Sequence, residues 1–229
     1  MKIVILTGAG VSAESGLGTF RDEGGLWSEY DLEEVATPEG FARDPSKVHA
    51  FYNARRANAA EARPNDAHVA LAELQQDHSG DVILITQNVD RLHEDAGAED
   101  VLHMHGRLDR AKCTNCRHQM DAPDELFADT PCPNCGEPTL RPDIVWFGEI
   151  PEHMDEIAAH LSEADVFVAI GTSGQVYPAA GFVAEAASHG AETIELNLEA
   201  SDVSALFDDI RLGPASEIVP AWVAEVLDS

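Results

Sequence analysis

Lysine is nearly absent from this chain, which has only three lysines among its 229 residues. Lysine and arginine together number 14, against 42 aspartates and glutamates, and the formal net charge is -28. A chain of this sign repels a nucleic-acid backbone, so direct nucleic-acid binding is not expected. Screening in concentrated salt limits repulsion among carboxylates, and the composition therefore predicts a halophilic protein.

Long apolar segments are missing as well. No run in the sequence approaches the roughly 20 apolar residues of a membrane-spanning helix, so no membrane partner is expected. The first glycines, Gly8 and Gly10, follow the apolar run 2–6 too closely for a secretory signal. We therefore expect a cytoplasmic protein. The sequence leaves the oligomeric state open, and a monomer is compatible with it.

Cysteine is confined to one segment, with "CTNC" at 113–116 and "CPNC" at 132–135. The spacing C-x2-C-x15-C-x2-C is typical of zinc sites. Four thiolates complete a tetrahedral site with no position open to water, which indicates a structural zinc ion. Disulfides, which the cytoplasm disfavours, and a redox motif, which needs only one pair, are the alternatives. The predicted ligands are Cys113, Cys116, Cys132 and Cys135.

Short apolar, β-rich runs occur at 2–6, 82–85, 101–104, 166–170 and 193–196, mostly separated by helix-compatible segments. This alternation predicts a parallel sheet covered by helices on both faces. Asn65 marks the start of one helix and Gly190 the end of another. Small or polar residues follow every strand, and ligands of such sheets bind at the carboxyl ends of the strands.

The loop after the first run fits a loose G-x-G-x-x-G/A pattern through Gly8, Gly10 and Ala13. Its amides suit a pyrophosphate, although a simple tight turn would give the same pattern. A conventional dinucleotide site also needs an acidic residue at the end of a second strand, and no strand precedes Asp22 or Glu23. Glu199, which follows a late strand, is the better candidate for a contact with the adenosine ribose.

Several segments together resemble the sirtuins, which are NAD-dependent protein lysine deacylases. They are "GAGVSAESGLGTFR", "TQNVDRLH", "HMHG", the two cysteine knuckles, "VWFGE", "GTS" and "NLE". "FYNARR" is similar to the class III group, bacterial and mitochondrial members that remove acidic acyl groups as well as acetyl. The resemblance implies an α/β fold. A Rossmann-like parallel sheet domain (1–28, 66–108 and 142–229) would carry a helical module (29–65) and a small inserted zinc-ribbon module (109–141).

The resemblance also implies the reaction. NAD would be consumed as a co-substrate, and the partners would be acylated-lysine proteins or peptides. The acyl oxygen would attack C1′ of the nicotinamide ribose and release nicotinamide. A ribose hydroxyl, deprotonated by histidine, would then attack, yielding free lysine and O-acyl-ADP-ribose. The acyl groups removed would be acetyl and, from "FYNARR", succinyl or malonyl.

Two histidines share one strand face in "HMHG". His105 precedes Gly106 as the family's catalytic histidine does, and its near-neutral intrinsic pKa suits a general base. His103 is expected to be structural.

The resemblance places the other NAD contacts in loops. Gln87 and Asn88 would serve the ribose and the catalytic water, and Val89 and Asp90 the nicotinamide carboxamide. Asn88 and Asp90 could equally cap a helix that begins near Arg91. A loop closing over the cofactor would include Phe20 and Arg21, unless these are a buried phenylalanine and a surface arginine. The full set is Gly8, Ala9, Gly10, Ala13, Phe20, Arg21, Trp27, Gln87, Asn88, Val89, Asp90, Gly171, Thr172, Ser173, Asn197, Leu198, Glu199 and Ala215.

The substrate contacts come from two segments. Tyr52 and Arg55 lie three apart in an alanine-rich helix and so share one face, where they would bind the free carboxylate of a succinyl or malonyl group. The alternative is a surface pair, and Arg56, on another face, is assigned to the surface. Val145 and Phe147 would flank the lysine tunnel, with nearby backbone pairing to the substrate as an added strand. The segment 145–149 is alternatively one more core strand.

Two other classes of protein function remain as alternatives from the sequence alone. A conventional NAD oxidoreductase needs a hydride-transfer site and the acidic residue discussed above, and neither is apparent. A zinc-ribbon interaction module accounts for the cysteines but leaves the polar strand ends unexplained.

The net charge of -28 predicts that salt stabilises the folded state. Lowering the ionic strength from 1 M to 0.1 M lengthens the Debye length from about 3 Å to about 10 Å, so repulsion among carboxylates reaches farther. The thermal unfolding temperature should therefore rise between roughly 0.1 M and 3 M potassium chloride, the range we choose around those screening lengths. A temperature that stays flat across this series contradicts the prediction.

Overall fold

The structure is a computed structural model of the chain, in which residues 1–18 and 31–228 are described. Within these residues the larger sheet has six parallel strands, and its middle strand β1 pairs with β2 on one side and β7 on the other. The sheet order is β3 (Leu102–His103), β2 (Val82–Thr86), β1 (Ile3–Thr7), β7 (Val166–Ile170), β8 (Glu192–Asn197) and β9 (Asp209–Leu212).

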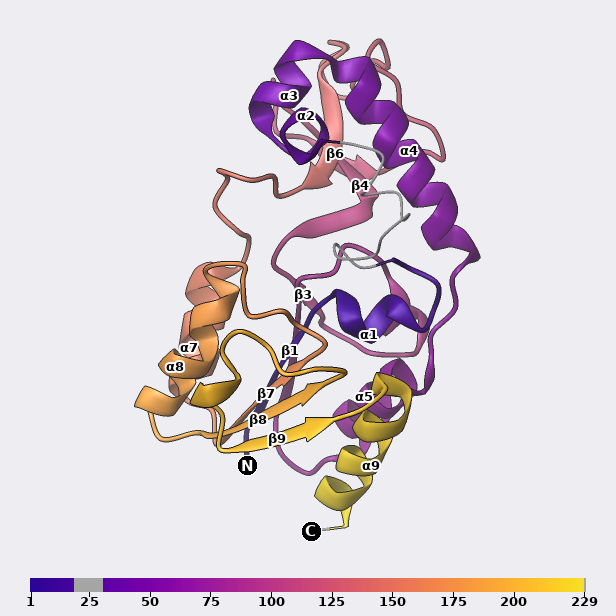
Figure 1. Cartoon of the computed structure of the whole chain (residues 1–229). Coiled ribbons are helices and arrows are strands. Elements are labelled where there is room, and N and C mark those ends of the chain that lie inside the picture. Colours follow the sequence, from indigo (N-terminus) through magenta and orange to yellow (C-terminus); the bar gives the residue numbers. More distant parts are fainter. Residues whose placement is uncertain (19–30, 229) are drawn as a thin grey trace.

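Helices cover both faces of this sheet, as Figure 1 shows. On one face, Ile3 and Ile5 of β1 belong to the core formed with α5 (Asp66–Asp77) and α9 (Ala215–Leu227). On the other face, Val4 and Leu6 of β1 belong to the core formed with α7 (Met154–Ser162) and α8 (Phe182–Ser188). Both sides of the strand are buried, which explains its uninterrupted apolar sequence.

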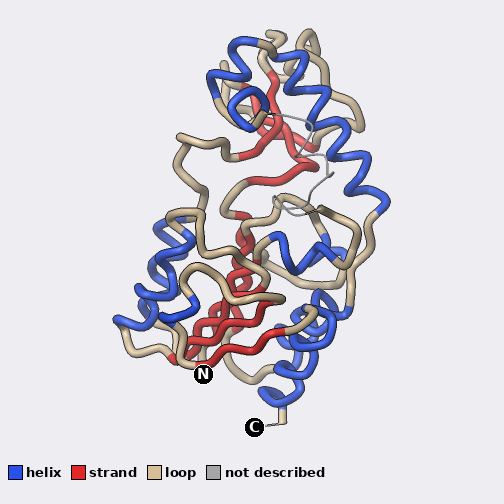
Figure 2. The backbone as a smooth tube through the Cα atoms, in the orientation of Figure 1, coloured by secondary structure: helices blue, strands red, loops and turns tan. Residues whose placement is uncertain are grey.

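A second, antiparallel sheet lies apart from the first one (Figures 1 and 2). It has the order β5 (Gln119–Asp121), β4 (Gly106–Cys113) and β6 (Leu140–Ile144). Three helices accompany it: α2 (Leu32–Val35), α3 (Pro38–Arg43) and α4 (Pro45–Glu61). Phe51 and Tyr52 of α4 share a core with Leu108 and Ile144 of the sheet, so the helical and zinc-binding segments form one packing unit.

The strands of this second sheet extend beyond the expected module boundaries. β4 begins at Gly106 and β6 ends at Ile144, so residues 106–108 and 142–144, assigned above to the Rossmann-like domain, belong to the small sheet. The division into three sequence segments otherwise stays a prediction.

Local signals place the helix ends. The Asn65 side chain accepts a hydrogen bond from the Ala67 N–H at 3.0 Å, and the Asn65 N–H donates to Nδ1 of His68 at 3.3 Å. This reciprocal capping box starts α5 at the predicted position. Asp44 caps α4 by accepting from the Lys47 N–H at 3.0 Å. Gly190 follows α8 with a φ of 93°, a conformation that favours glycine.

Short elements complete the described chain: α1 (Ala9–Ala13), α6 (Leu92–Asp95), and the 3-10 helices η2 (Ala179–Gly181) and η3 (Ser204–Leu206). β9 and the small sheet were not predicted. β9 alternates between partly buried and exposed residues at the sheet edge, and β4 contains several charged residues, so neither has a continuous apolar sequence. Among the described residues, no helix combines the length and the apolar character needed to cross a lipid bilayer.

Candidate active site

The loops at the carboxyl ends of four neighbouring strands are tied together by hydrogen bonds. After β2, the Gln87 N–H donates to the Thr7 carbonyl of β1 at 2.9 Å. The Gln87 side chain donates to the Thr172 hydroxyl after β7 at 3.0 Å, and the Asn197 amide at the end of β8 donates to the Thr172 carbonyl at 2.8 Å. The predicted convergence of strand ends is therefore present, and it brings Gln87, Thr172 and Asn197 together.

Glycine in the first loop is required by a close backbone contact. A Cβ atom on Gly8 would lie 2.8 Å from the Gly171 carbonyl oxygen, and one on Gly10 would lie 2.7 Å from the Gly171 Cα atom. Gly171 itself has a φ of 61°. The glycine pattern thus permits the β1 and β7 loops to touch, a role that the sequence did not reveal. Ala9 and Ala13 belong to α1, which opens directly from this loop.

The 87–90 segment turns towards this glycine loop. The Asn88 side-chain amide donates to the Gly8 carbonyl and to the Ser12 hydroxyl, each at 3.1 Å. Ser12 in turn donates to Oδ2 of Asp90 at 3.2 Å, while Oδ1 of Asp90 accepts from the Leu92 N–H at 3.0 Å. Asp90 therefore closes a turn just before α6, whose N-cap residue is Arg91, and neither Asn88 nor Asp90 is the cap of that helix.

Ser12 was not among the predicted site residues, although it lies within the glycine motif. Burial raises the pKa of Asp90, and the Leu92 N–H and the Ser12 hydroxyl oppose that rise. The carboxyl group is only 9% exposed. The hydrogen bonds from Ser12 and Leu92 fix the orientation of the Asp90 carboxyl group beside the Asn88 amide.

His105 is held by its Nδ1 atom, which lies 3.1 Å from the Gln87 carbonyl oxygen. A carbonyl only accepts, so Nδ1 carries the hydrogen, and Nε2 of the neutral ring is left able to accept a proton. Burial lowers the pKa of His105, against the opposing effect of the Gln87 hydrogen bond. The ring is therefore neutral at pH 7, as a general base must be.

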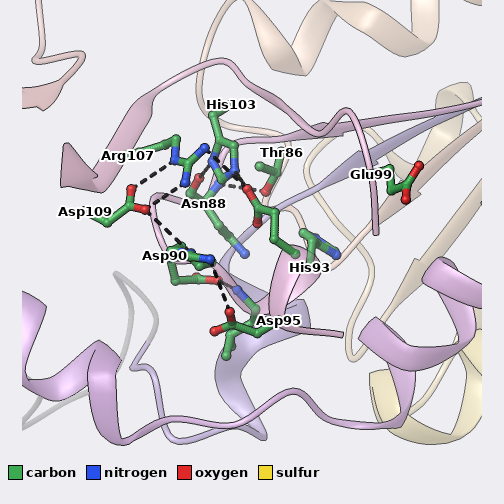
Figure 3. A network of polar contacts seen from close by, with 12 residues as sticks. Thr86, Asn88, Asp90, His93, Asp95, Glu99, His103, Arg107 and Asp109 are labelled. Atoms are coloured by element: carbon green, nitrogen blue, oxygen red, sulfur yellow. Dashed lines mark hydrogen bonds and ion pairs between the residues drawn. The ribbon is translucent and has the colours of Figure 1, made fainter. Parts of the chain in front are cut away.

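His103 makes two contacts, as Figure 3 shows, and this agrees with a structural role. Its Nδ1 lies 3.1 Å from the Asn88 carbonyl oxygen, and its Nε2 lies 2.8 Å from Oε1 of Glu94. The ring is 4% exposed. Both histidines of the motif therefore hold the 87–88 backbone.

Tyr52 is buried, with 1% of its surface exposed, and its hydroxyl oxygen accepts a hydrogen bond from Nε1 of Trp146 at 2.9 Å. Arg55 lies against it, with Cζ 5.7 Å from the Tyr52 ring centroid, and also hydrogen-bonds the hydroxyl. Burial raises the pKa of Tyr52, so the hydroxyl keeps its proton at neutral pH. The charge of Asp90 favours the charged form of Arg55, whose pKa burial lowers. The two residues are therefore not a solvated surface pair.

Trp146 was missed in the sequence because it lies between the two residues assigned to the tunnel. The Val145 N–H donates to the His105 carbonyl at 2.9 Å, and the Phe147 N–H donates to the Ala36 carbonyl at 3.0 Å. Phe147 is 51% exposed. The interpretation of 145–149 as a core strand is wrong, because the segment leaves β6 and turns.

The assignment of Arg56 to the surface is also wrong. This residue is only 9% exposed, because residues 122–126 lie across α4. Asn53 holds that segment through two hydrogen bonds to the Leu126 backbone, at 3.1 and 3.0 Å. Arg56 donates to Asn53 and, at 3.5 Å, to the Asp124 carbonyl.

The remaining predicted NAD residues differ in exposure. Leu198 and Glu199 are exposed at the end of β8. Ala215 opens α9, and Ser173 accepts from the Asp202 N–H at 3.1 Å. Phe20, Arg21 and Trp27 lie outside the described residues.

A cavity of about 1440 Å³ lies between α4, residues 122–129 and the 89–95 segment. Val89 and Asp90 belong to its described lining, whereas His105, Tyr52 and Arg55 do not. The predicted catalytic and acyl-binding residues therefore lie outside this cavity.

The four cysteines are gathered at one point, with their Sγ atoms within 4.8 Å of one another. Cys113 and Cys135, and likewise Cys116 and Cys132, have Sγ atoms 3.7 Å apart. A tetrahedron with Zn–S bonds of about 2.3 Å has edges of about 3.8 Å, so the residues present fit a zinc ion.

Hydrogen bonds, led by that from the Thr139 hydroxyl, lower the pKa of Cys113 to about 6, while burial raises that of Cys132 to about 11. Metal binding must therefore displace at least one thiol proton.

Residues 8–178 match the model of the Sir2 family. The chain belongs to the Sir2 family.

This sirtuin is 57% identical over 231 residues to the NAD-dependent protein deacylase of Caulobacter vibrioides, covering 99% of this chain and 97% of that one. It is 53% identical over 229 residues to the protein of the same name from Escherichia coli K12, covering 99% and 82%. The sirtuin resemblance and the enzyme class, an NAD-dependent protein deacylase, are thereby confirmed.

Solved structures agree. A Sir2 homologue in complex with NAD superposes with a TM-score of 0.91 at 40% identity, covering 99% of this chain and 90% of that chain. Sir2 bound to an acetylated peptide gives a TM-score of 0.83 at 27% identity, covering 97% and 92%. The predicted Rossmann-like fold and the cofactors, NAD and zinc, are confirmed. The oxidoreductase and the free-standing zinc-ribbon module are thereby excluded.

We expect zinc to hold the small sheet together without taking part in the reaction. Cys113→Ser should lose bound zinc and destabilise the fold, because the free energy of metal binding is also folding free energy. Metal analysis and thermal unfolding check this, with Ser46→Ala in α4 as a control away from the thiols. A stable, active and zinc-free variant contradicts the structural role.

The pH dependence of the reaction should reflect the lowered pKa of His105. A general base acts deprotonated, so kcat/KM rises as the pH rises through that pKa and levels off above it. The acidic limb should therefore lie below about pH 6.5, the ordinary value for histidine. The profile is measured with acetyl-lysine peptide. An acidic limb of the kcat/KM profile that lies above about pH 6.5 contradicts the assignment of His105 as the general base.

Proposed function

We propose that this sirtuin removes acetyl and succinyl or malonyl groups from lysine side chains of proteins, releasing nicotinamide and O-acyl-ADP-ribose. The observation that carries the proposal is the pair of hydrogen bonds, one part-buried and one buried, that orient His105 on the Gln87 carbonyl and Tyr52 on Trp146. The relatives named NAD-dependent protein deacylase and the Sir2 structure with acetylated peptide support it.

His105 is the general base of the proposal. Its Nδ1–H is engaged by Gln87, so the ring presents Nε2 to a ribose hydroxyl and takes the proton that the hydroxyl loses as it attacks. Bound NAD supplies the C1′ carbon that the acyl oxygen attacks, with nicotinamide as the leaving group. Asn88 lies beside the base and is proposed to orient the ribose and the water.

The NAD-binding role of the strand-end loops is likewise a proposal. Asp90 keeps an aligned carboxyl group for the nicotinamide carboxamide. The loops after β7 and β8 would hold the adenosine half, with Glu199 exposed and able to reach a ribose. Phe20, Arg21 and Trp27 are proposed to close over the cofactor. The cytoplasmic location and halophilic character also stay predictions.

Acyl selection is assigned to Tyr52 and Arg55. The Tyr52 oxygen already accepts from Trp146, which leaves its own O–H to donate. Arg55 beside it can meet a carboxylate with two parallel hydrogen bonds. Because Tyr52 is buried and Arg55 is only partly exposed, concentrated salt screens the pair less than a fully exposed one. Val145 and Phe147 would flank the acyl-lysine as it approaches this pair.

The first test is mass spectrometry of acetyl-lysine and succinyl-lysine peptides incubated with the enzyme and NAD. Loss of the acyl mass, with release of nicotinamide, is expected for both peptides. Nicotinamide release that does not depend on an acyl-peptide would contradict the deacylase reaction.

The second test measures acyl selection in the double variant Tyr52→Phe, Arg55→Met. Hydrogen bonds to a charged group contribute about 1.5–3 kcal/mol, so desuccinylation should fall about 10- to 150-fold while deacetylation is retained. The double variant Tyr177→Phe, Arg63→Met, at two exposed positions, is the matched control. Equal losses of both activities would show that Tyr52 and Arg55 support the fold and do not select the acyl group.

A further inference from the structure

The segment that carries Asn88 leaves the sheet at a defined point. Parallel pairing of β2 with β3 ends with Thr86 opposite His103, and the next backbone bond is from the Met104 N–H to the Thr86 carbonyl at 3.0 Å. Beyond it, the carbonyls of Gln87 and Asn88 accept from the side chains of His105 and His103. Imidazole donors thus extend the pairing where the two backbones separate.

His103 uses both ring nitrogens in this position. The Asn88 carbonyl requires a hydrogen on Nδ1. Burial favours a protonated Glu94, but the His103 hydrogen bond and the charge of Arg107 outweigh it, so the pKa of Glu94 is lowered. The Glu94 carboxylate lies 2.8 Å from Nε2, so the ring is held at both of its nitrogens. It cannot rotate without giving up one of two buried hydrogen bonds.

Glu94 is itself held by a chain of ion pairs that reaches the surface (Figure 3). Arg107 lies 3.7 Å from Oε1 of Glu94 and donates to both carboxylate oxygens of Asp109, at 2.9 and 2.7 Å. Arg91 lies 3.5 Å from Asp109 and 3.6 Å from Asp95. These residues come from α6, β4 and the turn between β2 and α6, so the chain joins three elements around His103.

Other titratable groups also face His103, and one of them, His93, is neutral because burial lowers its pKa. Asp90 belongs to the 87–90 segment, Glu152 precedes α7, and His93 is on α6. Of the groups named, Glu94 makes the direct hydrogen bond to the ring. Its contact is therefore the one whose loss would free the imidazole.

We propose that His103, fixed by Glu94, is a positioning residue that keeps Asn88 and the neighbouring Gln87 carbonyl aligned for the reaction. The inference rests on the proposed roles of Asn88 and His105. Asn88 reaches Gly8 and Ser12 only while its backbone stays in place. A displacement of about 1 Å in a reacting geometry costs about 10²-fold in rate, so a tether of this kind has a measurable effect.

Two conservative substitutions separate position from charge. Glu94→Gln keeps the length of the side chain, and its amide can donate to Nε2 of a neutral His103 while Nδ1 still holds Asn88. Glu94→Asp keeps the charge but withdraws the carboxylate by one methylene group. Glu99→Asp is the control, because Glu99 is an exposed glutamate outside this chain of ion pairs whose hydrogen bonds to Gln75 are made by its backbone.

We expect Glu94→Asp to lower kcat for deacetylation about 10- to 100-fold, with the peptide KM unchanged. Glu94→Gln should stay within about threefold of the unchanged protein, and the control should match it. The acidic limb of the kcat/KM profile should keep its position in all three variants. The positioning role would be overturned if Glu94→Gln lost more activity than Glu94→Asp, or if both variants were equally active. A shift in the pH of the acidic limb of the kcat/KM profile would also overturn it.

His105→Ala distinguishes this proposal from the one on which it rests. By the usual range for a general base, it should lose about 10²–10⁴-fold in deacylation. If His105→Ala remains active, the catalytic assignment fails whatever the Glu94 variants do. If His105→Ala is inactive and Glu94→Asp is fully active, the catalytic assignment stands and the positioning role fails.

Discussion

The contact between the loop after β1 and the loop after β7 determines how the rest of the site is arranged. Gly8 and Gly10 approach Gly171 so closely that a Cβ atom on either would overlap its backbone. With these loops in contact, the Gly8 carbonyl and the Ser12 hydroxyl stand where the Asn88 amide can bind both. The 87–90 segment is thereby drawn across the strand ends, and His103 of β3 and His105, which follows that strand, hold its carbonyls.

The small sheet and its helices act on the opposite side of that segment. The four clustered cysteines bring the end of β4 and the cysteine-bearing loops together, while Asn53 and Arg56 attach residues 122–126 to α4. Tyr52 lies on the same helix and is fixed by Trp146. A zinc ion held by the cysteines would therefore help to set where α4, with Tyr52, lies. Arg141, with Cζ 3.4 Å from the Trp146 ring centroid, strengthens this part of the core.

Strands buried on both faces could be predicted from the sequence, because burial favours continuous apolar residues and β1, β2 and β7 have them. β8 was also predicted, although its buried residues include Thr193 and Glu195. The zinc site could be predicted just as directly, because coordination of zinc by paired cysteines requires a characteristic spacing in the sequence. β9 and β4 were missed because one is half exposed and the other carries charges.

Tertiary contacts explain the remaining differences. Arg56 contacts Asp124, 68 residues away in the chain, and Trp146 contacts Tyr52 across 94 residues. Neither contact has a local sequence signal. The tethering of the Asn88 carbonyl by His103 is of the same kind, because it depends on where two strands separate.

The scarcity of lysine has a consequence for an enzyme that acts on acylated lysines. Each of its three amines lies against a carboxylate: Lys2 pairs with Glu163, Lys47 with Glu34 and Lys112 with Asp143. The protein therefore presents few sites for the modification that it removes, and it competes little with its own substrates.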